Sequence, residues 1–212
     1  MTNKLFYFSI EKVLIQKISD SKKKLQIAVA WFTNPVIYQL ILKLIDEGVI
    51  VELIIADDVI NFTNSLVNFQ KIIDRNVDFR ISKSPNLMHN KFCIIDDNIL
   101  INGSYNWTLK AENSNFENIV VSTDRNLLNE FNNYFNYLKR NTAKITLINT
   151  QQFNKYISEE EVKIEFEFLN NFDDKSIENF KNETINERIN DLAYEAVLDA
   201  QYNYQIDRKS VV

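Results

Sequence analysis

Apolar residues along the chain follow two spacings, one typical of helices and one typical of buried strands. Two short and nearly continuous apolar runs, 25–31 and 49–56, have the length of buried strands. Ser9 stands at the N-cap position before a set with i, i+3, i+4 spacing, which predicts a helix; its members are Ile10, Val13, Leu14 and Ile18.

A helix is predicted between the two apolar runs, because Pro35 stands where it would begin and Gly48 where it would end. This gives a strand-helix-strand unit. Helical spacing then continues over 57–76, and residues 77–81 alternate as a strand does.

The segment after Pro85 predicts a hairpin, with extended residues 87–95 and 99–102 joined by a polar turn at 96–98. A strand over 119–122 and a helix over 124–140 follow. Strands that alternate with helices, together with one hairpin, predict an α/β sandwich: a mixed sheet flanked by helices.

Charge divides the chain near Thr150. Residues 1–154 hold 17 Lys and Arg against 15 Asp and Glu, whereas 155–212 hold 7 against 14. We therefore expect a catalytic domain over 1–150 and an acidic helical C-terminal extension over 151–212, with helices near 158–169 and 174–204. The extension is either a solvated helical face or a surface for a protein partner; if it restrains the site, truncation after Thr150 raises activity.

Composition excludes several function classes. The single cysteine, Cys93, rules out an internal disulfide, and the single histidine, His89, leaves too few ligands for an ordinary zinc site. The two glycines cannot form a glycine-rich phosphate loop. No apolar run is long enough to cross a membrane and no leader pattern opens the chain, so we expect a cytoplasmic protein without cofactor or metal.

His89 and Lys91 are two positions apart on a predicted strand, so both side chains leave one face, roughly 7 Å apart. The hairpin returns the chain so that residues 103–106 lie beside His89 and add a hydroxyl and an amide. An imidazole, a fixed cation and neutral donors suit a phosphate diester, which needs positioning and charge stabilisation above all. A neutral imidazole can attack phosphorus and form a phosphohistidine.

The pattern His-x-Lys-x4-Asp-x6-Gly-Ser-x-Asn resembles the signature of the phospholipase D superfamily. Residues 115–121, Asn-Phe-Glu-Asn-Ile-Val-Val, also resemble the corresponding stretch of its small bacterial single-motif endonucleases. The resemblance covers roughly residues 8–140. The signature itself is matched at His89, Lys91, Asp96, Gly103, Ser104 and Asn106.

This resemblance implies a role for each matched residue. His89 is the nucleophile, Lys91 and Asn106 grip the phosphate, and Ser104 adds a hydroxyl contact. Glu117 stands where the family has an acid that orients a catalytic histidine. Asp96 matches the motif aspartate, and we expect an indirect part for it, in holding the hairpin in place.

The family reaction uses two histidines, and this chain has one. The resemblance therefore implies a homodimer in which two copies of the motif meet at a twofold axis. We expect a metal-independent phosphodiesterase that acts on nucleic acid, DNA in preference to RNA, and that has no membrane partner. The alternatives are a phospholipase and a catalytically silent binding module for nucleic acid or protein.

Basic clusters, aromatic residues, acidic pairs and the cysteine also carry expectations. Local phosphate contacts would come from basic clusters such as 22–24 and 139–140, and Trp31, Phe32 and Trp107 are candidates for base stacking. The acidic pairs at 57–58 and 96–97 have a structural interpretation, as a helix start and a hairpin turn. Cys93 is expected to be a packed thiol.

Overall fold

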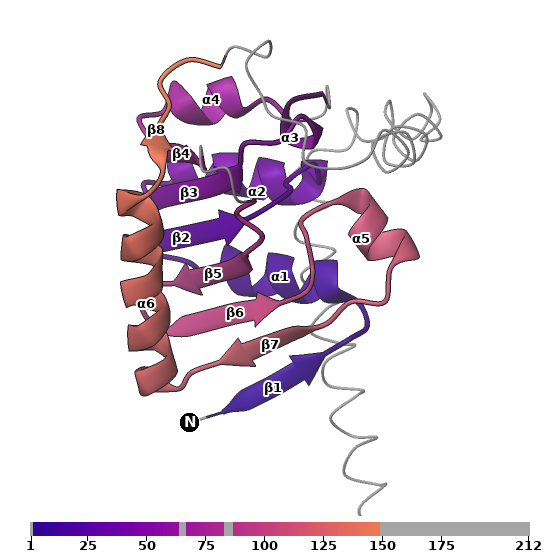
Figure 1. The fold of residues 1–212 in the computed structure, drawn as a ribbon. Coiled ribbons are helices and arrows are strands. Elements are labelled where there is room, and N and C mark those ends of the chain that lie inside the picture. The colour runs from indigo at the N-terminus through magenta and orange to yellow at the C-terminus, as the bar shows by residue number, and fades with distance from the viewer. Residues whose placement is uncertain (1, 64–66, 83–86, 149–212) are drawn as a thin grey trace, which may run out of the picture.

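The computed structural model describes residues 2–63, 67–82 and 87–148, and the extension predicted over 151–212 lies outside these residues. An eight-stranded sheet of order β1-β7-β6-β5-β2-β3-β4-β8 forms the centre of the fold. Figure 1 shows the strands side by side in this order. They are β1 (Asn3–Phe6), β2 (Lys24–Val29), β3 (Ile50–Ala56), β4 (Asp78–Ser82), β5 (Lys91–Ile95), β6 (Ile99–Gly103), β7 (Ile119–Ser122) and β8 (Ala143–Lys144).

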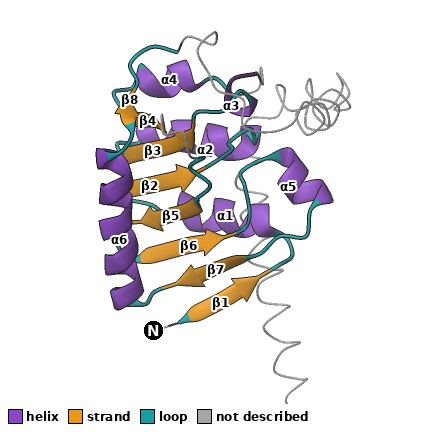
Figure 2. Cartoon of the chain, in the orientation of Figure 1, coloured by secondary structure: helices purple, strands orange, loops and turns teal. Residues whose placement is uncertain are grey.

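Helices cover both faces of the sheet, as Figure 2 shows. They are α1 (Ile10–Ser19), α2 (Pro35–Asp46), α3 (Ile60–Thr63), α4 (Phe69–Ile73), α5 (Leu109–Ser114) and α6 (Arg125–Arg140). Helices α1 and α2 lie behind the sheet in this view, and α6 crosses its other face. The arrangement confirms the predicted α/β sandwich with helices on both faces of its sheet.

The sheet is mixed in the way the sequence predicts. Strands β2, β3 and β4 are mutually parallel, and every other neighbouring pair is antiparallel. The parallel part contains the strand-helix-strand unit, in which Pro35 opens α2 and the Asn34 side chain accepts hydrogen bonds from the backbone N–H groups of Val36 and Ile37. Gly48, with φ 90°, follows α2 and turns the chain into β3.

Two apolar layers hold the helices to the sheet. The side facing α1 and α2 holds the larger cluster, with residues such as Ile15, Ile27 and Leu53 fully buried. The side facing α6 holds a smaller one around Phe92 and Phe135. Because a strand points successive side chains to opposite faces, β5 contributes to both layers, and burying both faces stabilises it.

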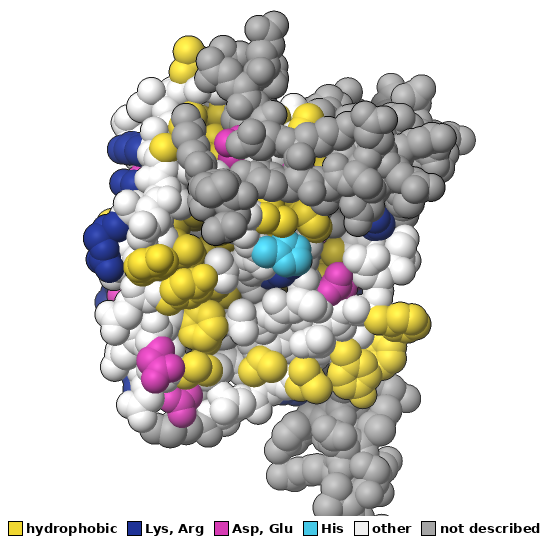
Figure 3. All heavy atoms as spheres, viewed as in Figure 1, with side chains coloured by type: hydrophobic (Ala, Val, Ile, Leu, Met, Phe, Trp, Pro, Cys, Tyr) yellow, Lys and Arg dark blue, Asp and Glu magenta, His cyan; other side chains and the backbone are white. Residues whose placement is uncertain are grey.

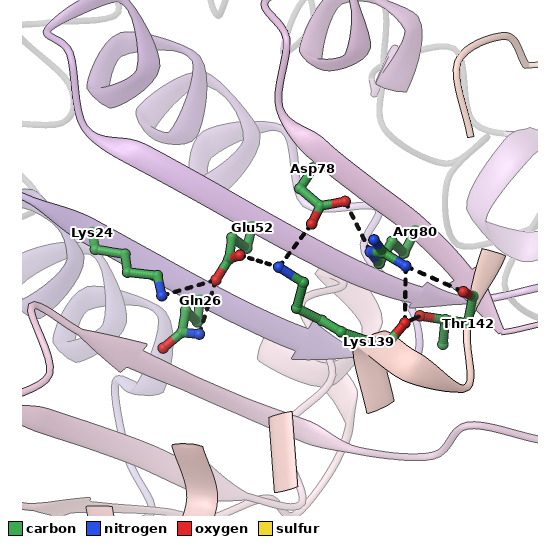
Figure 4. Close-up of polar contacts among 7 residues, drawn as sticks. All are labelled: Lys24, Gln26, Glu52, Asp78, Arg80, Lys139 and Thr142. Carbon is green, nitrogen blue, oxygen red and sulfur yellow. Dashed lines mark hydrogen bonds and ion pairs between the residues drawn. The ribbon is translucent and has the colours of Figure 1, made fainter. Parts of the chain in front are cut away.

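The sheet face under the C-terminal end of α6 carries a network of charged and polar side chains (Figure 4). The Lys139 ammonium of α6 contacts the carboxylates of Glu52 on β3 and Asp78 on β4. Lys24 also contacts Glu52, at 3.1 Å, and the Gln26 amide donates to Glu52 at 2.9 Å. This network fastens the C-terminal turn of α6 across three parallel strands.

The predicted helix over 57–76 is wrong as a single element, because two short helices, α3 and α4, occupy part of it. Asn61 is fully buried, and its amide donates to the carbonyls of Ala30 and Ala56. Asn68 caps a new helix by accepting from the N–H of Gln70. Asn side chains that bind backbone groups compete with a continuous helix, which apolar spacing alone does not reveal.

Three short elements escaped the sequence analysis: β1, α5 and β8. Ser9 does precede α1, but its side chain makes no capping hydrogen bond. In the described ranges no helix has both the length and the apolarity needed to cross a membrane.

Candidate active site

Four strands begin or end near the motif residues, at one edge of the sheet, where edge means the side formed by the strand ends. Strand β2 ends there, because Val29 pairs with Lys91 at the start of the antiparallel β5. Strand β6 ends at the same edge, and β7 begins there, since Gly103 pairs with Ile119. His89, Lys91, Ser104, Asn106 and Glu117 therefore come from the starts or ends of three neighbouring strands.

His89 lies on the surface at this edge, where Figure 3 shows the imidazole. Its ring packs edge-on against Trp31, with 5.4 Å between ring centroids. Partial burial lowers the pKa of His89 below its ordinary value, and the nearby Lys91 cation lowers it further. The lowered pKa favours the neutral imidazole, the form that carries a lone pair for attack on phosphorus.

Lys91 places its cation beside His89. The side chain is 9% exposed, and its ammonium donates a 2.9 Å hydrogen bond to the backbone carbonyl of His89. It also lies 5.7 Å from the centroid of the Trp31 ring. Burial lowers the pKa of Lys91 to about 8, against the opposing effect of the Glu117 carboxylate.

Asn106 is buried, and its amide oxygen accepts a 3.4 Å hydrogen bond from the Trp31 backbone N–H. This contact leaves the NH₂ group as the donor that can meet a phosphate oxygen. The backbone around it is fixed because residues 31–34 bind the segment that ends at Trp107: the N–H groups of Thr33 and Asn34 both donate to the Trp107 carbonyl.

Ser104 and Glu117 form a pair at the same edge. The Ser104 hydroxyl donates to one carboxylate oxygen of Glu117 and accepts from the backbone N–H of Asn118 at 3.1 Å. The other carboxylate oxygen accepts from the Asn115 amide at 3.0 Å. Among the described residues no hydrogen bond joins Glu117 to His89, so the orienting role of Glu117 stays a prediction.

Asp96 lies at the opposite edge of the sheet, past the far end of β5. Five residue steps separate it from Lys91, about 16 Å of extended chain. Its carboxylate accepts from the backbone N–H groups of Lys22, Lys23 and Lys24, each at 2.8 Å. Burial opposes ionisation, but these hydrogen bonds outweigh it and hold the pKa of Asp96 below its usual range. These contacts fit the indirect role expected for Asp96.

The burial and the partners of the candidate stacking aromatics, the basic clusters and Cys93 bear on the remaining expectations. Phe32 and Trp107 are buried and cannot stack on a base, which leaves Trp31 beside His89. Lys139 is engaged by two carboxylates, and the backbone N–H groups of 22–24 bind Asp96 at the far edge, so phosphate contacts from the two clusters stay a prediction. Cys93 is a packed thiol, whose pKa burial raises.

The acidic pairs are structural, as predicted. Asp58 accepts from the N–H of Ile60 at the start of α3, and Asp96 and Asp97 form the hairpin turn with φ of 51° and 52°. In the part of the chain that the structure describes, no three His, Cys, Asp or Glu residues gather in a way that could hold a metal ion.

A neutral imidazole, a cation at its side, an amide NH₂ and a hydroxyl at one sheet edge define a site for phosphodiester chemistry. The family described as "Cardiolipin synthase, PLD-like domain" matches residues 14–139. The chain therefore belongs to the phospholipase D-like family of phosphodiesterases.

Individual relatives agree with this assignment. The mitochondrial cardiolipin hydrolase of Chlamydomonas reinhardtii is 34% identical over 121 residues, which cover 57% of this chain and 53% of that protein. A phospholipase D of Rickettsia prowazekii is 25% identical over 120 residues, covering 57% and 58%. The chain thus spans only about half the length of the curated relatives it matches.

Two bacterial structures share the fold along their whole length. NucT from Helicobacter pylori matches with a TM-score of 0.58 and 24% identity, covering 68% of this chain and 99% of that one. Nuc from Salmonella typhimurium, described as a phospholipase D family member, matches with a TM-score of 0.61 and 23% identity, covering 69% and 99%.

Tyr134 and Tyr137 of α6 belong to the surroundings of the site, and the sequence analysis did not single them out. Both line a groove that His89 shares. Their spacing of three residues shows that they share a helix face. Only the placement of α6 against the start of β5 shows that this face adjoins the site.

Proposed function

We propose that the chain is a metal-independent endonuclease that cleaves DNA through a phosphohistidine on His89, in a site shared by two copies. The observation that carries the proposal is the imidazole of His89 beside the buried ammonium of Lys91 at one open sheet edge. A phosphate between them meets a nucleophile and a fixed charge without further rearrangement.

The reaction has two balanced steps. A ring nitrogen of His89 attacks phosphorus and forms a P–N bond while the P–O ester bond breaks, and the leaving oxygen takes a proton from the imidazolium of His89 of the partner subunit. Water then attacks phosphorus, gives its proton to the partner's His89, now neutral, and breaks the P–N bond. Lys91 and the Asn106 NH₂ hold the phosphate oxygens throughout.

Nucleic acid is proposed over lipid from the extent of the structural match. NucT and Nuc, which the chain resembles, are matched over 99% of their length, whereas the cardiolipin hydrolases are matched over about half. The chain therefore matches the small bacterial members of the family over their full length, and its signature residues also resemble theirs.

Plasmid nicking tests the proposal. The full chain should nick supercoiled DNA equally with and without a chelator, and His89→Ala or Lys91→Ala should lower the rate at least 10³-fold, because they remove the nucleophile or the phosphate grip. Wild-type protein denatured with detergent at alkaline pH, where the P–N bond of phosphohistidine is stable, should retain label from a 5′- or 3′-labelled strand, and His89→Ala should not. Strong nicking by His89→Ala would contradict the histidine mechanism.

A phospholipase is the second candidate, because the relatives from Chlamydomonas and Rickettsia are named for lipid cleavage. Turnover of cardiolipin vesicles, measured beside plasmid nicking with the same preparation, separates the two functions. We expect nicking to exceed lipid turnover by orders of magnitude, and the reverse ratio would favour the phospholipase.

A further inference from the structure

A groove with a volume of about 490 Å³ lies along His89. One wall is the segment that leads into β5, with Met88, His89 and Asn90, and the other is the C-terminal half of α6. A phosphate bound at His89 therefore lies beside this groove. The chemical group attached to that phosphate can enter the groove.

Two tyrosines give the groove an aromatic wall. The rings of Tyr134 and Tyr137 are nearly parallel, at 14°, with centroids 6.3 Å apart, and their residues are 41% and 54% exposed. Tyr134 is held in place, because its ring stacks on Phe92 at 29° and its hydroxyl oxygen accepts from the Asn90 amide at 3.2 Å. Exposed rings with a fixed orientation suit a flat aromatic ligand.

The remaining described residues of the lining are polar or aliphatic and uncharged. Among the described residues of the groove, four carry hydroxyls and two carry side-chain amides, while Leu87, Met88 and Leu138 are aliphatic and none is Lys, Arg, Asp or Glu. A nucleobase presents both a π-face and hydrogen-bonding edges, which this lining can meet. A lipid acyl chain would leave most of these polar groups without a partner.

We propose that the groove binds the nucleobase next to the phosphate that His89 attacks, with the base stacked on Tyr134 and Tyr137. This inference rests on the proposed nuclease function and adds to it a preference for single-stranded over duplex DNA. A base in a duplex is already stacked between its neighbours and paired, so it must leave the helix to enter the groove, at a cost of a few kcal/mol. A base in a single strand enters without that cost.

The test compares two single-stranded oligomers of equal length, oligothymidylate and an abasic deoxyribose-phosphate chain. Stacking of a base on an aromatic side chain contributes to the free energy of binding, so Tyr137→Leu should raise the KM for oligothymidylate about tenfold or more. The same variant should change the KM for the abasic oligomer less than twofold, which also shows that it folds. Tyr137→Phe keeps the ring and should restore the low KM, and Asn136→Ala, exposed on α6 outside the groove, is the matched control.

The outcomes separate the two proposals. If the wild type cuts oligothymidylate but Tyr137→Leu behaves like Asn136→Ala, or affects both oligomers alike, the groove does not bind a base and the nuclease function stands. A lower KM for duplex than for the same strand alone also overturns the base site. If the wild type cuts neither oligomer while it hydrolyses cardiolipin vesicles, the nuclease function itself fails.

Discussion

The motif glycine illustrates how a single residue shapes the site. A Cβ atom on Gly103 would lie 2.0 Å from the Asn118 carbonyl oxygen and 2.8 Å from the Ile119 Cα. Gly103 is not among the residues with a positive φ, so lack of space, not backbone conformation, is what requires glycine at this position. The close approach of β6 and β7 is what brings Ser104 and Glu117 into contact.

Gly103→Ala should therefore damage the site as well as the fold. The methyl group displaces Asn118 and with it the carboxylate of Glu117, so we expect kcat/KM for DNA cleavage to fall at least tenfold. Gly48→Ala is the matched control: it strains a positive φ but meets no atom within 4 Å, so it should lower the stability by about 1 kcal/mol and leave kcat/KM unchanged. Wild-type kcat/KM in Gly103→Ala would contradict this account.

The pKa shifts of His89 and Lys91 predict the pH dependence of cleavage. In the proposed dimer one His89 must be neutral and the partner's His89 protonated, so the two titrate as a coupled pair; kcat/KM should fall on an acidic limb under pH 6.5, where both become protonated. Above pH 8 the free enzyme loses the Lys91 charge, whose pKa is about 8, so kcat/KM should fall again as pH rises. A bound phosphate raises that pKa, so the alkaline limb of kcat should lie higher; identical alkaline limbs for kcat and kcat/KM would contradict a phosphate contact from Lys91.

At the scale of elements, apolar contacts hold α6 to the sheet along its length, and ion pairs hold it at its C-terminal end. Burial opposes ionisation of Glu52, but hydrogen bonds from Lys139 and Lys24 outweigh it and lower the pKa of Glu52. Burial also opposes ionisation of Asp78, but hydrogen bonds from Lys139 and Arg80 outweigh it and lower the pKa of Asp78. Arg80 also donates to the carbonyls of Lys139 and Thr142, where α6 ends and the groove begins. The position of the Tyr134 and Tyr137 wall thus depends on this network.

Lys139→Met should loosen α6 and reduce acid sensitivity. It leaves two half-buried carboxylates without their shared cation, so we expect the free energy of unfolding at pH 7 to fall by about 1–3 kcal/mol in urea titrations. In the wild type the lowered carboxyl pKa values contribute stability above about pH 4 that is lost as pH falls through the folded-state values. This acid-dependent loss should be smaller in Lys139→Met, and an unchanged pH dependence would contradict a coupled network.

At the scale of the whole molecule, one imidazole per chain leaves the proposed reaction without its proton donor. Phe116, fully exposed, directly precedes Glu117 at the site, and Phe8 is 72% exposed beside Tyr7. We propose that a second copy covers Phe116, because a twofold axis that joins two sites must pass close to the residues that surround one of them. Burial of these rings would supply hydrophobic stabilisation to the dimer.

Sedimentation and activity measured together test the shared site. The wild type should sediment as a dimer, and Phe116→Asp should weaken the dimer and lower nicking in parallel, with activity recovered at higher protein concentration. Leu147→Asp changes another exposed apolar residue, which follows β8 at the other side of the sheet from β7, and should alter neither. A monomeric wild type with full nicking activity would contradict the shared site.

The linear chain determined much of this protein. Spacing of apolar residues placed most of the strands and the helices α1 and α6, because burial on one face or two imposes the periods of 3.6 and 2, and Pro35 and Gly48 bounded α2. Strand alternation and a hairpin sufficed to predict that His89 and Lys91 share a face and that residues 103–106 return toward them, since both are local geometry.

Only the tertiary structure decided which distant groups meet. The antiparallel pairing of β5 with β2 put Trp31 against His89 and sent Asp96 to the far edge, and the pairing of β6 with β7 joined Ser104 to Glu117. Lys139 seemed free for phosphate in the sequence because its partners, Glu52 and Asp78, lie more than sixty residues away. Long-range pairing follows from the packing of whole layers, so no local pattern carries it.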